Sequence, residues 1–546
     1  MPTPRILSSR WLPLIMAVVV AGLASLPQIL PIRQVVDHQD PLFSIWRTAW
    51  IGHALAQSPS RLFHGNVFYP QPYTLTYSDA VLLQGVAHTG LTLAGASVTV
   101  AYNLLIWLSF PLSALTMFLL AEKVSGRAWA AFPPAIAYAL SAYRFDHIMH
   151  LEVLWTQWLP LHFYLAMVAY ERGTWRSALA LGVSLVAQMF SCLYFFLFSL
   201  TALPVAAAAQ FAAARRVPGR ALFRVVVVGI VLVAPLAAAY GQVYTRGLRE
   251  VGPRRLDEVR IYSAGLGTFF AAPTRNLVFG WTEARWGGPN EKQLFPGLVV
   301  LLLAAAALLR ARGPYVWALG AVTAFAIAMA LGVHGPLYTF FYTYVPGYAN
   351  LRVPTRFGGF VSMGVAGLAA CGLARLMRGH DTRKQAYLLS VLTVLILIET
   401  ATAPSDRRSI PETPTPVDRY LAKLPNAVVV EYPFSSPGWL PHNDHLYQLR
   451  TIHHWRPLVN GYSGNYPPEY LRLIDGLAEE EAGSTAWLDL LRRAGATHLI
   501  VHKDLDKPDV TGALLYALEP RADVKSIGEL ACWPDSCAVY ELHARP

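Results

Sequence analysis

The sequence predicts an α-helical polytopic membrane protein of about eleven transmembrane helices with a small periplasmic α/β domain at its C-terminal end. Three observations support this class. Hydrophobic residues make up 54% of the 546 residues, charged residues make up only 14%, and the mean hydropathy is +0.38. The apolar residues form long stretches, and a proline-rich linker separates the last of them from a segment of mixed composition. This composition excludes a soluble enzyme, a disordered chain and a disulfide-dense mini-protein.

The first apolar stretch has the pattern of an uncleaved signal anchor. It runs from Trp11 to Leu30 and follows Arg5 and Arg10, and no small-x-small cleavage site closes it, since it continues through Pro27 and Pro31. The N-terminus is therefore expected in the cytoplasm. The predicted spans are 12–31, 98–121, 128–142, 151–170, 177–192, 194–213, 222–243, 296–310, 314–332, 357–377 and 386–403.

Basic loops between the spans predict the orientation of the chain. Each of the expected cytoplasmic loops carries at least two Lys or Arg residues: Glu122–Arg127, Glu171–Arg176, Arg215–Arg224, Arg310–Arg312 and Arg375–Lys384. The alternation requires that the apolar segment Val81–Ala96 does not cross, so it is predicted as a re-entrant or interfacial helix. Since the net charge of +11 resides largely in such loops, no nucleic-acid partner is expected.

The predicted spans and the linker divide the chain into two domains. Residues 1–404 form a transmembrane domain with outer loops 32–97 and 244–295, and residues 405–546 form an extracytoplasmic α/β domain. The linker 409–416 contains three prolines, which stiffen the chain at the boundary. Strands and helices alternate beyond it, at 427–432, 467–477, 485–494, 497–502 and 538–542.

The C-terminal domain carries two kinds of residue with chemical interest. Cys532 and Cys537 are close enough for a short-loop disulfide in an oxidising compartment, the alternative being two unpaired thiols, whereas Cys192 and Cys371 lie in spans as core thiols. Its aromatic residues resemble a carbohydrate platform, although packing is the alternative: Trp439, Trp455, Tyr462, Tyr466 and Tyr470.

Two carboxylates follow the first span, where the bilayer meets water. Asp37 and Asp40 precede the stretch 43–55, whose aromatic residues Trp46 and Trp50 share one helical face, as in a helix lying on the membrane surface. A carboxylate at this level can take a proton from an incoming hydroxyl while a lipid-borne leaving group enters from the membrane. The alternative for Asp40 is an N-cap of that helix.

Further ionisable residues lie near the ends of spans. Asp79 precedes the re-entrant segment, where capping is again the alternative. His147, His150 and Glu152 could ligate a metal, but two histidines three residues apart are a weak motif, and polar capping of a span end is the alternative. The sequence contains no phosphate-binding glycine loop, Gly-x-Ser-x-Gly elbow or paired CxxC.

Arginines of the outer segments are candidates for phosphate binding. The second outer loop, which includes Arg275, carries eight Lys and Arg residues against five acids, and an arginine fork can bind phosphate oxygens. Arg352 and Arg356, just before a span, form a second candidate clamp. Contact with anionic lipid headgroups is the alternative for both groups.

The architecture and three strings of residues resemble the GT-C superfamily of polytopic glycosyltransferases. The common features are an N-in first span, an acidic motif at its outer end, a long first outer loop, many further spans and an outer α/β domain. The strings run from Asp40-Pro41 through Trp46 and Trp50 to Leu62-Phe63-His64-Gly65-Asn66-Val67-Phe68-Tyr69-Pro70, from Tyr143 to Leu151 with Trp158-Leu159-Pro160, and from Pro346 to Phe357.

The resemblance implies an enzyme of the bacterial inner membrane. It would transfer a hexosyl or pentosyl group from a polyprenyl-phosphate sugar donor to a glycan, lipid or protein acceptor on the outer face, with Asp40 as general base. The family's acidic pair is often adjacent or one residue apart, whereas Asp37 and Asp40 are three apart, so both remain candidates. The candidates for substrate binding are Asp79, His147, His150, Glu152, Arg275, Arg352 and Arg356.

Two other classes remain as alternatives. A transporter or flippase of a lipid-linked saccharide would carry ionisable groups and repeats within its spans, which here are almost free of charge. A non-catalytic envelope-assembly protein would not need eleven spans as an anchor. The sequence requires no cofactor, although Asp37, Asp40, His147 and Glu152 could supply ligands to a divalent metal.

Overall fold

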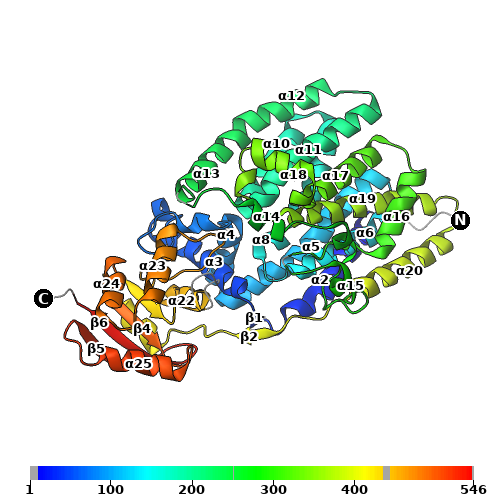
Figure 1. The fold of residues 1–546 in the computed structure, drawn as a ribbon. Helices are drawn as coiled ribbons and strands as arrows, with labels where there is room; N and C mark the ends of the chain where they lie inside the picture. The colour runs from blue at the N-terminus through cyan, green and yellow to red at the C-terminus, as the bar shows by residue number, and fades with distance from the viewer. Residues whose placement is uncertain (1–9, 250, 290, 435–442, 544–546) are drawn as a thin grey trace. The chain divides into compact units, whose positions relative to one another are not determined.

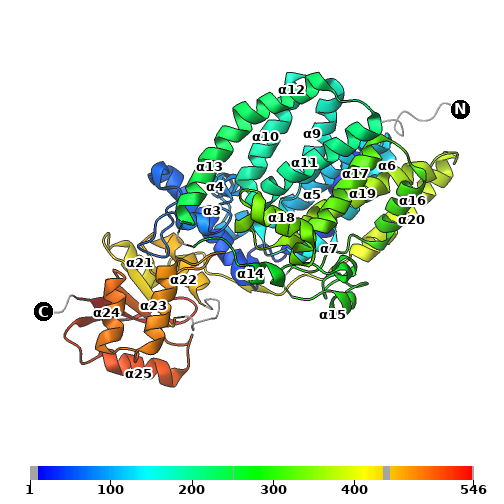
Figure 2. The same ribbon diagram turned by 45° about the horizontal axis from the view of Figure 1, so that its top comes forward.

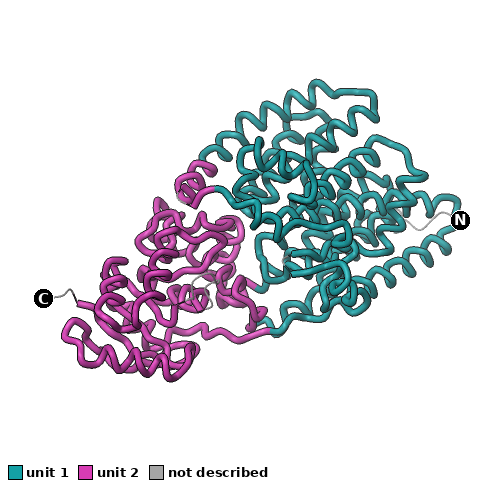
Figure 3. Tube along the Cα trace, viewed as in Figure 1, with its two compact units in different colours: residues 1–32, 103–239, 253–406 teal, residues 33–102, 240–252, 407–546 magenta. Residues whose placement is uncertain are grey.

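Helices predominate in the computed structural model, which describes residues 10–249, 251–289, 291–434 and 443–543 (Figure 1, Figure 2). The chain forms two compact units, coloured separately in Figure 3. Unit 1 consists of Met1–Ile32, Asn103–Ala239 and Pro253–Asp406, and unit 2 consists of Arg33–Tyr102, Tyr240–Gly252 and Arg407–Pro546. Most of the first predicted outer loop therefore belongs to the same unit as the C-terminal segment, a grouping that the sequence did not predict.

Unit 1 is built from helices. Its α-helices are α2 (Trp11–Ser25), α5 (Val98–Ser125), α6 (Ala128–Ala139), α7 (Ala142–Asp146), α8 (Leu151–Leu154), α9 (Trp158–Arg172), α10 (Trp175–Ser191), α11 (Leu193–Ala214), α12 (Gly219–Val228), α13 (Ala234–Gly247), α14 (Leu256–Ile261), α15 (Thr282–Trp286), α16 (Leu298–Arg310), α17 (Pro314–Ala330), α18 (Pro336–Tyr344), α19 (Gly358–Leu376) and α20 (Thr382–Thr400). Short helices extend or join them: η1 (Leu26–Ile29), the π-helical η4 (Gly229–Val233), η5 (Leu266–Phe270), η6 (Gly332–His334), η7 (Tyr348–Asn350) and η8 (Pro354–Phe357). The ends of α5 and α13 reach into unit 2.

Each predicted span coincides with one helix or with two or three successive helices. Among the described residues, five helical segments are long and apolar enough to cross a membrane: Trp11–Ile29, Val98–Ser125, Leu193–Ala214, Gly219–Gly247 and Pro354–Leu376. The apolar helices α16 and α17 are shorter, at 13 and 17 residues. The exact number of eleven spans therefore remains a prediction.

Helix α19 forms the centre of unit 1, where it lies against α6, α16 and α17 (Figure 2). Its glycines allow the neighbouring backbones to approach closely, as small residues do in membrane helices. A Cβ on Gly372 would lie 2.0 Å from the carbonyl oxygen of Leu303 in α16, and one on Gly367 would lie 2.7 Å from Leu319 in α17. Small side chains therefore determine the packing around α19.

Unit 2 combines helices with strands (Figure 1). Its helices are α3 (Gln39–Gln57), η2 (Pro59–Arg61), η3 (Thr74–Tyr77), α4 (Leu82–Leu93), α21 (Pro416–Ala422), α22 (Asp444–Arg450), η9 (Thr451–His453), α23 (Pro468–Glu479), α24 (Thr485–Arg493) and α25 (Pro508–Leu518). Its strands are β1 (Gln34–Val36), β2 (Arg407–Ser409), β3 (Val429–Tyr432), β4 (His498–His502), β5 (Val524–Ala531) and β6 (Ser536–Leu542).

Four strands form a mixed sheet in the order β3-β4-β6-β5. The strands β3 and β4 are parallel, with Val430 opposite Leu499, whereas β6 runs antiparallel to both β4 and β5. Trp487 and Leu488 of α24 pack in the same hydrophobic core as Leu499. The strands β3, β4 and β6 and the helices α23 and α24 coincide with predicted elements, and β5 is additional.

The N-terminal part of unit 2 is joined to the C-terminal part by hydrogen bonds. Strand β1 pairs antiparallel with β2, and the amide of Phe68 donates to the carbonyl of Asn460. Trp46 of α3 donates through its indole N–H to both Asn66 and Thr451. Since Trp46 and Trp50 are only 1% and 8% exposed, the aromatic face that was expected on a membrane surface is instead buried inside this unit.

Candidate functional site

Asp40 lies in the first turn of α3, immediately after β1 and a short turn. His38 is the N-cap of this helix, because its Nδ1 accepts a hydrogen bond of 3.2 Å from the Asp40 amide. The interpretation of Asp40 as the cap is therefore wrong: the cap position falls two residues earlier. The Asp40 side chain is directed to other partners.

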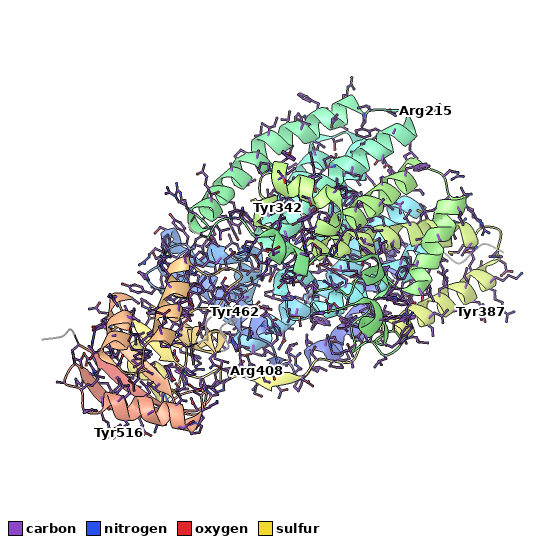
Figure 4. All side chains as sticks on the ribbon, viewed as in Figure 1. Arg215, Tyr342, Tyr387, Arg408, Tyr462 and Tyr516 are labelled. Carbon is purple, nitrogen blue, oxygen red and sulfur yellow. A yellow bond between two sulfur atoms is a disulfide. The ribbon has the colours of Figure 1, made fainter. Side chains whose placement is uncertain are left out.

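The Asp40 carboxylate is oriented by a tyrosine that follows it by 422 residues. The Tyr462 hydroxyl, labelled in Figure 4, donates to Asp40 Oδ1 at 2.9 Å. The Tyr462 ring packs edge-on against Phe43, and its amide donates to Gln448, so the position of the hydroxyl is well defined. Asp40 Oδ2 lies 3.4 Å from His38 Nδ1, and the carboxylate side chain is 21% exposed. This is a positioned carboxylate with solvent access, as a general base requires.

Asp37 has a different environment from Asp40. Its Oδ1 lies 3.3 Å from Nε of Arg408 on β2, and its side chain is 55% exposed. Burial lowers the pKa of Arg408, and the charge of Asp37 opposes that shift. Asp37 is therefore paired with a cation, and this distinguishes the two candidate bases that the sequence left open.

Asp79 precedes α4 without capping it, because α4 begins after Val81, which occupies the N-cap position. The main-chain carbonyl of Asp79 accepts a hydrogen bond of 2.9 Å from the buried guanidinium of Arg47. The next amide, of Ala80, donates to the Tyr244 hydroxyl. The turn that carries Asp79 is thus held by hydrogen bonds within unit 2.

The remaining predicted site residues belong to unit 1, where Glu291 links two of them. Arg356 forms a bidentate ion pair with Glu291, with N···O distances of 2.9 and 2.8 Å. His147 Nε2 lies 3.1 Å from Glu291 Oε2, the oxygen that also accepts from Arg356 Nε, and His147 Nδ1 lies 3.5 Å from Asp146. The His150 ring packs edge-on against His147 at 5.5 Å. Glu152 is buried in the first turn of α8.

This network is charged despite its burial. Desolvation opposes a charge on His147, but Glu291 and Asp146 raise its pKa to about 9. Desolvation also opposes ionisation of Glu291, but Arg356 and His147 hold its pKa well below the usual range. Because Arg356 donates two hydrogen bonds to Glu291 and His147 lies within ion-pair distance of it, we interpret these residues as a structural ion network.

A second group of cations surrounds Glu258. Arg254 Nη1 and Arg352 Nη1 lie 3.0 and 2.9 Å from the same Glu258 oxygen. Arg352 also lies over the Tyr262 ring, and its side chain is 30% exposed. The pKa of Arg254 is lowered, mainly by burial and to a smaller extent by the positive charge of Arg352. The negative charge of Glu258 raises this pKa and so opposes the shift. Two guanidinium groups therefore contact one carboxylate oxygen, and guanidinium groups are the side chains best suited to bind phosphate.

Arg275 joins helix α7 to the segment that follows α20 in unit 1. Its Nη1 donates to the carbonyl of Ala403 at 2.7 Å, and its Nη2 donates to the carbonyl of Phe145 at 2.9 Å. Phe145 precedes the Asp146-His147 pair, so Arg275 helps to position the ion network. Arg275 uses two of its N–H groups for main-chain carbonyls, so fewer of its donors can bind a phosphate than in Arg352.

Sequence reasoning missed several residues that organise the candidate site. Glu291 and Glu258 were counted only as acids of a basic loop, and no spacing in the sequence marks them. Arg144 was not singled out, yet its buried guanidinium donates to Ser109, Ser113 and the carbonyls of Ala139 and Leu154. Its position within an apolar stretch was the one available signal, because a buried arginine needs such partners.

The aromatic residues of the predicted platform are largely packed. Trp439 lies outside the described residues. Trp455 stacks on His53 at 4.2 Å, and Tyr466 and Tyr470 pack edge-on against Phe68. Of this set, Tyr462 is the one whose hydroxyl contacts a candidate catalytic residue.

Solved structures share the fold of this chain, although no protein-family model and no curated protein sequence matches it. Arabinofuranosyltransferase AftD from Mycobacteria matches over 98% of this chain and 40% of its own, with a TM-score of 0.59 and 17% identity. Oligosaccharyltransferase AglB from Archaeoglobus fulgidus, in complex with an inhibitory peptide and a dolichol-phosphate, matches over 93% of this chain and 72% of its own, with a TM-score of 0.51 and 12% identity.

At 17% and 12% identity, these matches show that the chain shares the fold of AftD and of AglB. The chain spans about two fifths of the length of AftD. Together with the five long apolar helical segments in the described residues, the shared fold identifies an integral membrane protein.

Proposed function

We propose that the protein is a glycosyltransferase that moves a hexosyl or pentosyl group from a polyprenyl-phosphate donor to an acceptor on the outer face of the membrane. A fold supports many functions, so the proposal rests on a site. The single observation that carries it is the Asp40 carboxylate, oriented by the Tyr462 hydroxyl at the start of α3. The dolichol-phosphate seen with AglB supports a lipid-linked donor.

The proposed reaction assigns Asp40 as the general base. The acceptor hydroxyl attacks the anomeric carbon of the donor sugar as the bond from that carbon to the phosphate oxygen breaks. Asp40 Oδ2 takes the hydroxyl proton, while Oδ1 remains hydrogen-bonded to Tyr462. The lipid phosphate leaves with the electron pair. Asp37 is a weaker candidate because Arg408 already pairs with it.

Within unit 1, Arg352 and Arg254 are the candidates for binding a phosphate group. Both contact the same oxygen of Glu258. An arginine can bind two phosphate oxygens at once. Arg356 is bound bidentately to Glu291, so we assign it a supporting role.

The proposed cellular setting is the bacterial inner membrane. In it, the N-terminus lies in the cytoplasm, residues 1–404 contain about eleven spans, and residues 405–546 form an extracytoplasmic α/β domain. The glycan, lipid or protein acceptor would then be reached from outside. The base mechanism itself requires no cofactor, and sugar transfer with and without EDTA tests whether a divalent metal takes part.

The proposal is tested by sugar transfer in membranes, with radiolabelled polyprenyl-phosphate sugars as donors. The Asp40→Asn variant should lose about 100-fold or more in kcat, the range expected when a general base is removed. Asp37→Asn should retain most of the activity. Asp257→Asn is a matched control, because that carboxylate is 77% exposed and pairs with the exposed Arg255.

Expression and detergent extraction of all three variants should equal those of the wild type. Full transfer by Asp40→Asn would contradict the base assignment. A wild-type chain that moves a lipid-linked saccharide across vesicles without forming a new glycosidic bond would identify a flippase instead.

A further inference from the structure

Four side chains with metal-ligating atoms meet at one end of the strands β4 and β6. His502 is the last residue of β4, and the turn between β5 and β6 carries Cys532 and Asp535, with Cys537 at the start of β6. The ligand atoms of these four residues all lie within 4.8 Å of one another, which is close enough to hold one metal ion. In the structure Cys532 and Cys537 form a disulfide, which is one of the two alternatives that the sequence left open for these cysteines.

The spacing of these atoms is close to that of a tetrahedral zinc site. His502 Nδ1 lies 3.3 Å from Cys537 Sγ, 3.7 Å from Cys532 Sγ and 2.8 Å from Asp535 Oδ1. Asp535 Oδ1 lies 3.2 Å from Cys532 Sγ. Bonds of about 2.3 Å to sulfur and about 2.0 Å to nitrogen or oxygen place neighbouring ligand atoms about 3.3–3.8 Å apart. Small side-chain shifts are enough to reach this geometry.

A buried carboxylate already orients the histidine. His502 Nε2 lies 2.7 Å from Glu431 Oε2, and the two side chains are 2% and 7% exposed. The Tyr447 ring stacks on the imidazole at 4.9 Å. Metal-bound histidines commonly donate their second N–H to a carboxylate, which fixes the tautomer and the ring orientation. Because Glu431 takes Nε2, the other ring nitrogen, Nδ1, faces Asp535 Oδ1 and the two sulfur atoms.

We propose that the dithiol form of this chain binds one Zn²⁺ through Cys532, Cys537, His502 Nδ1 and Asp535, and that the disulfide and the metal exclude each other. Two thiolates, an imidazole and a carboxylate are a donor set that suits Zn²⁺. A tetrahedral site holds its two sulfur atoms about 3.8 Å apart, so they cannot be bonded to each other while they bind the ion.

The change from disulfide to dithiol requires a reductant, and a small dithiol is sufficient. The reductant loses two electrons and two protons and becomes a disulfide, the bond between the two Sγ atoms breaks, and each sulfur takes one proton. Binding of Zn²⁺ then releases the two thiol protons to solvent. Cys532 is partly exposed, which gives the reductant and the ion access to the cluster.

The test uses the full-length chain purified in detergent, in air-oxidised form and after reduction by a phosphine. Each form is titrated with Zn²⁺ alone and, in a parallel experiment, with Co²⁺ alone. The reduced form should bind one equivalent, with thiolate-to-cobalt absorption for Co²⁺ and two sulfur neighbours in the X-ray absorption spectrum of Zn²⁺. The oxidised form should show neither signal.

Variants locate the site. Asp535→Asn should weaken binding, Glu431→Gln should weaken it about 10- to 100-fold by removing the partner of Nε2, and His502→Ala should abolish the one-equivalent signal. A Cys192→Ser, Cys371→Ser double variant is the control, since both thiols are buried in unit 1, and should bind as the wild type does.

Three outcomes would overturn the proposal. The first is a reduced chain that binds no Zn²⁺, and the second is an oxidised chain that binds it equally well. The third is an unchanged affinity in both Asp535→Asn and Glu431→Gln. These two substitutions preserve side-chain size, so they test the site even where His502→Ala does not fold.

Discussion

At the level of single residues, two carboxylates three positions apart have unlike neighbours. Asp37 pairs with Arg408, whereas Asp40 accepts a hydrogen bond from a neutral tyrosine. The sequence places both at the same point after the first span, so spacing alone could not distinguish them. The partners come from β2 and from the segment after α22, more than 350 residues away in the chain.

The hydroxyl of Tyr462 offers a test of how Asp40 is positioned. Tyr462→Phe keeps the ring contact with Phe43 but removes the donor to Asp40, and hydrogen bonds to charged groups contribute about 1.5–3 kcal/mol. We expect kcat for sugar transfer to fall about 10- to 100-fold with little change in KM. Tyr516→Phe is the matched control, because Tyr516 is 79% exposed on α25 (Figure 4). Equal kcat values in both variants would remove Tyr462 from the mechanism.

Arg352 offers a test of donor binding. Arg352→Ala should raise KM for the polyprenyl-phosphate sugar about 10- to 100-fold, since a charge-assisted contact to phosphate is lost. Arg352→Lys should recover part of the affinity through its charge. Arg255→Ala is the control, because the Arg255 side chain is 85% exposed. An unchanged KM in Arg352→Ala would leave Arg352 as a structural residue that pairs with Glu258.

At the level of elements, helix ends depend on contacts that local propensity does not specify. For Asp40 and Asp79 the sequence left capping as an alternative, because aspartate is common at N-cap positions. Instead, His38 caps α3, and α4 begins after Val81. Arg47 binds the main chain of Asp79, which places its turn ahead of α4. Neither aspartate therefore occupies an N-cap position.

The packing of α19 gives a prediction about helix contacts. Gly372→Ala would place a methyl group against the Leu303 carbonyl, and overpacking of this kind costs about 1–3 kcal/mol. The apparent melting temperature in detergent should therefore fall. Gly320→Ala on α17 is the control, because its new Cβ would meet Leu308 at an ordinary contact distance of 3.6 Å. Equal melting temperatures would show that α16 and α19 can separate without loss of stability.

At the level of the whole molecule, the buried ion network of unit 1 links stability to pH. The pKa of His147 is raised from 6.5 to about 9, so its contribution is complete below pH 6.5 and is lost as the pH rises through 9. The wild type should therefore lose thermal stability between pH 6.5 and 9. His147→Gln should show a smaller change over this range.

The same network predicts the effect of removing its central carboxylate. Glu291→Gln leaves Arg356 and His147 buried without their anion, which destabilises a protein by about 3–5 kcal/mol. The variant should also lose the pH dependence between 6.5 and 9. If its melting temperature equals that of the wild type at pH 6, solvent rather than Glu291 compensates the two cations.

The sequence by itself determined the membrane class, the helical stretches and the strands β3, β4 and β6. Long apolar runs and short alternating segments are local patterns, so they can be read without knowledge of distant contacts. Tertiary structure alone decided that residues 33–102 and 407–546 form one unit, that Tyr462 meets Asp40, and that Glu291 joins His147 to Arg356. Each of these depends on pairing between segments that are far apart in the chain, and such pairing leaves no periodic signal in the sequence around either partner.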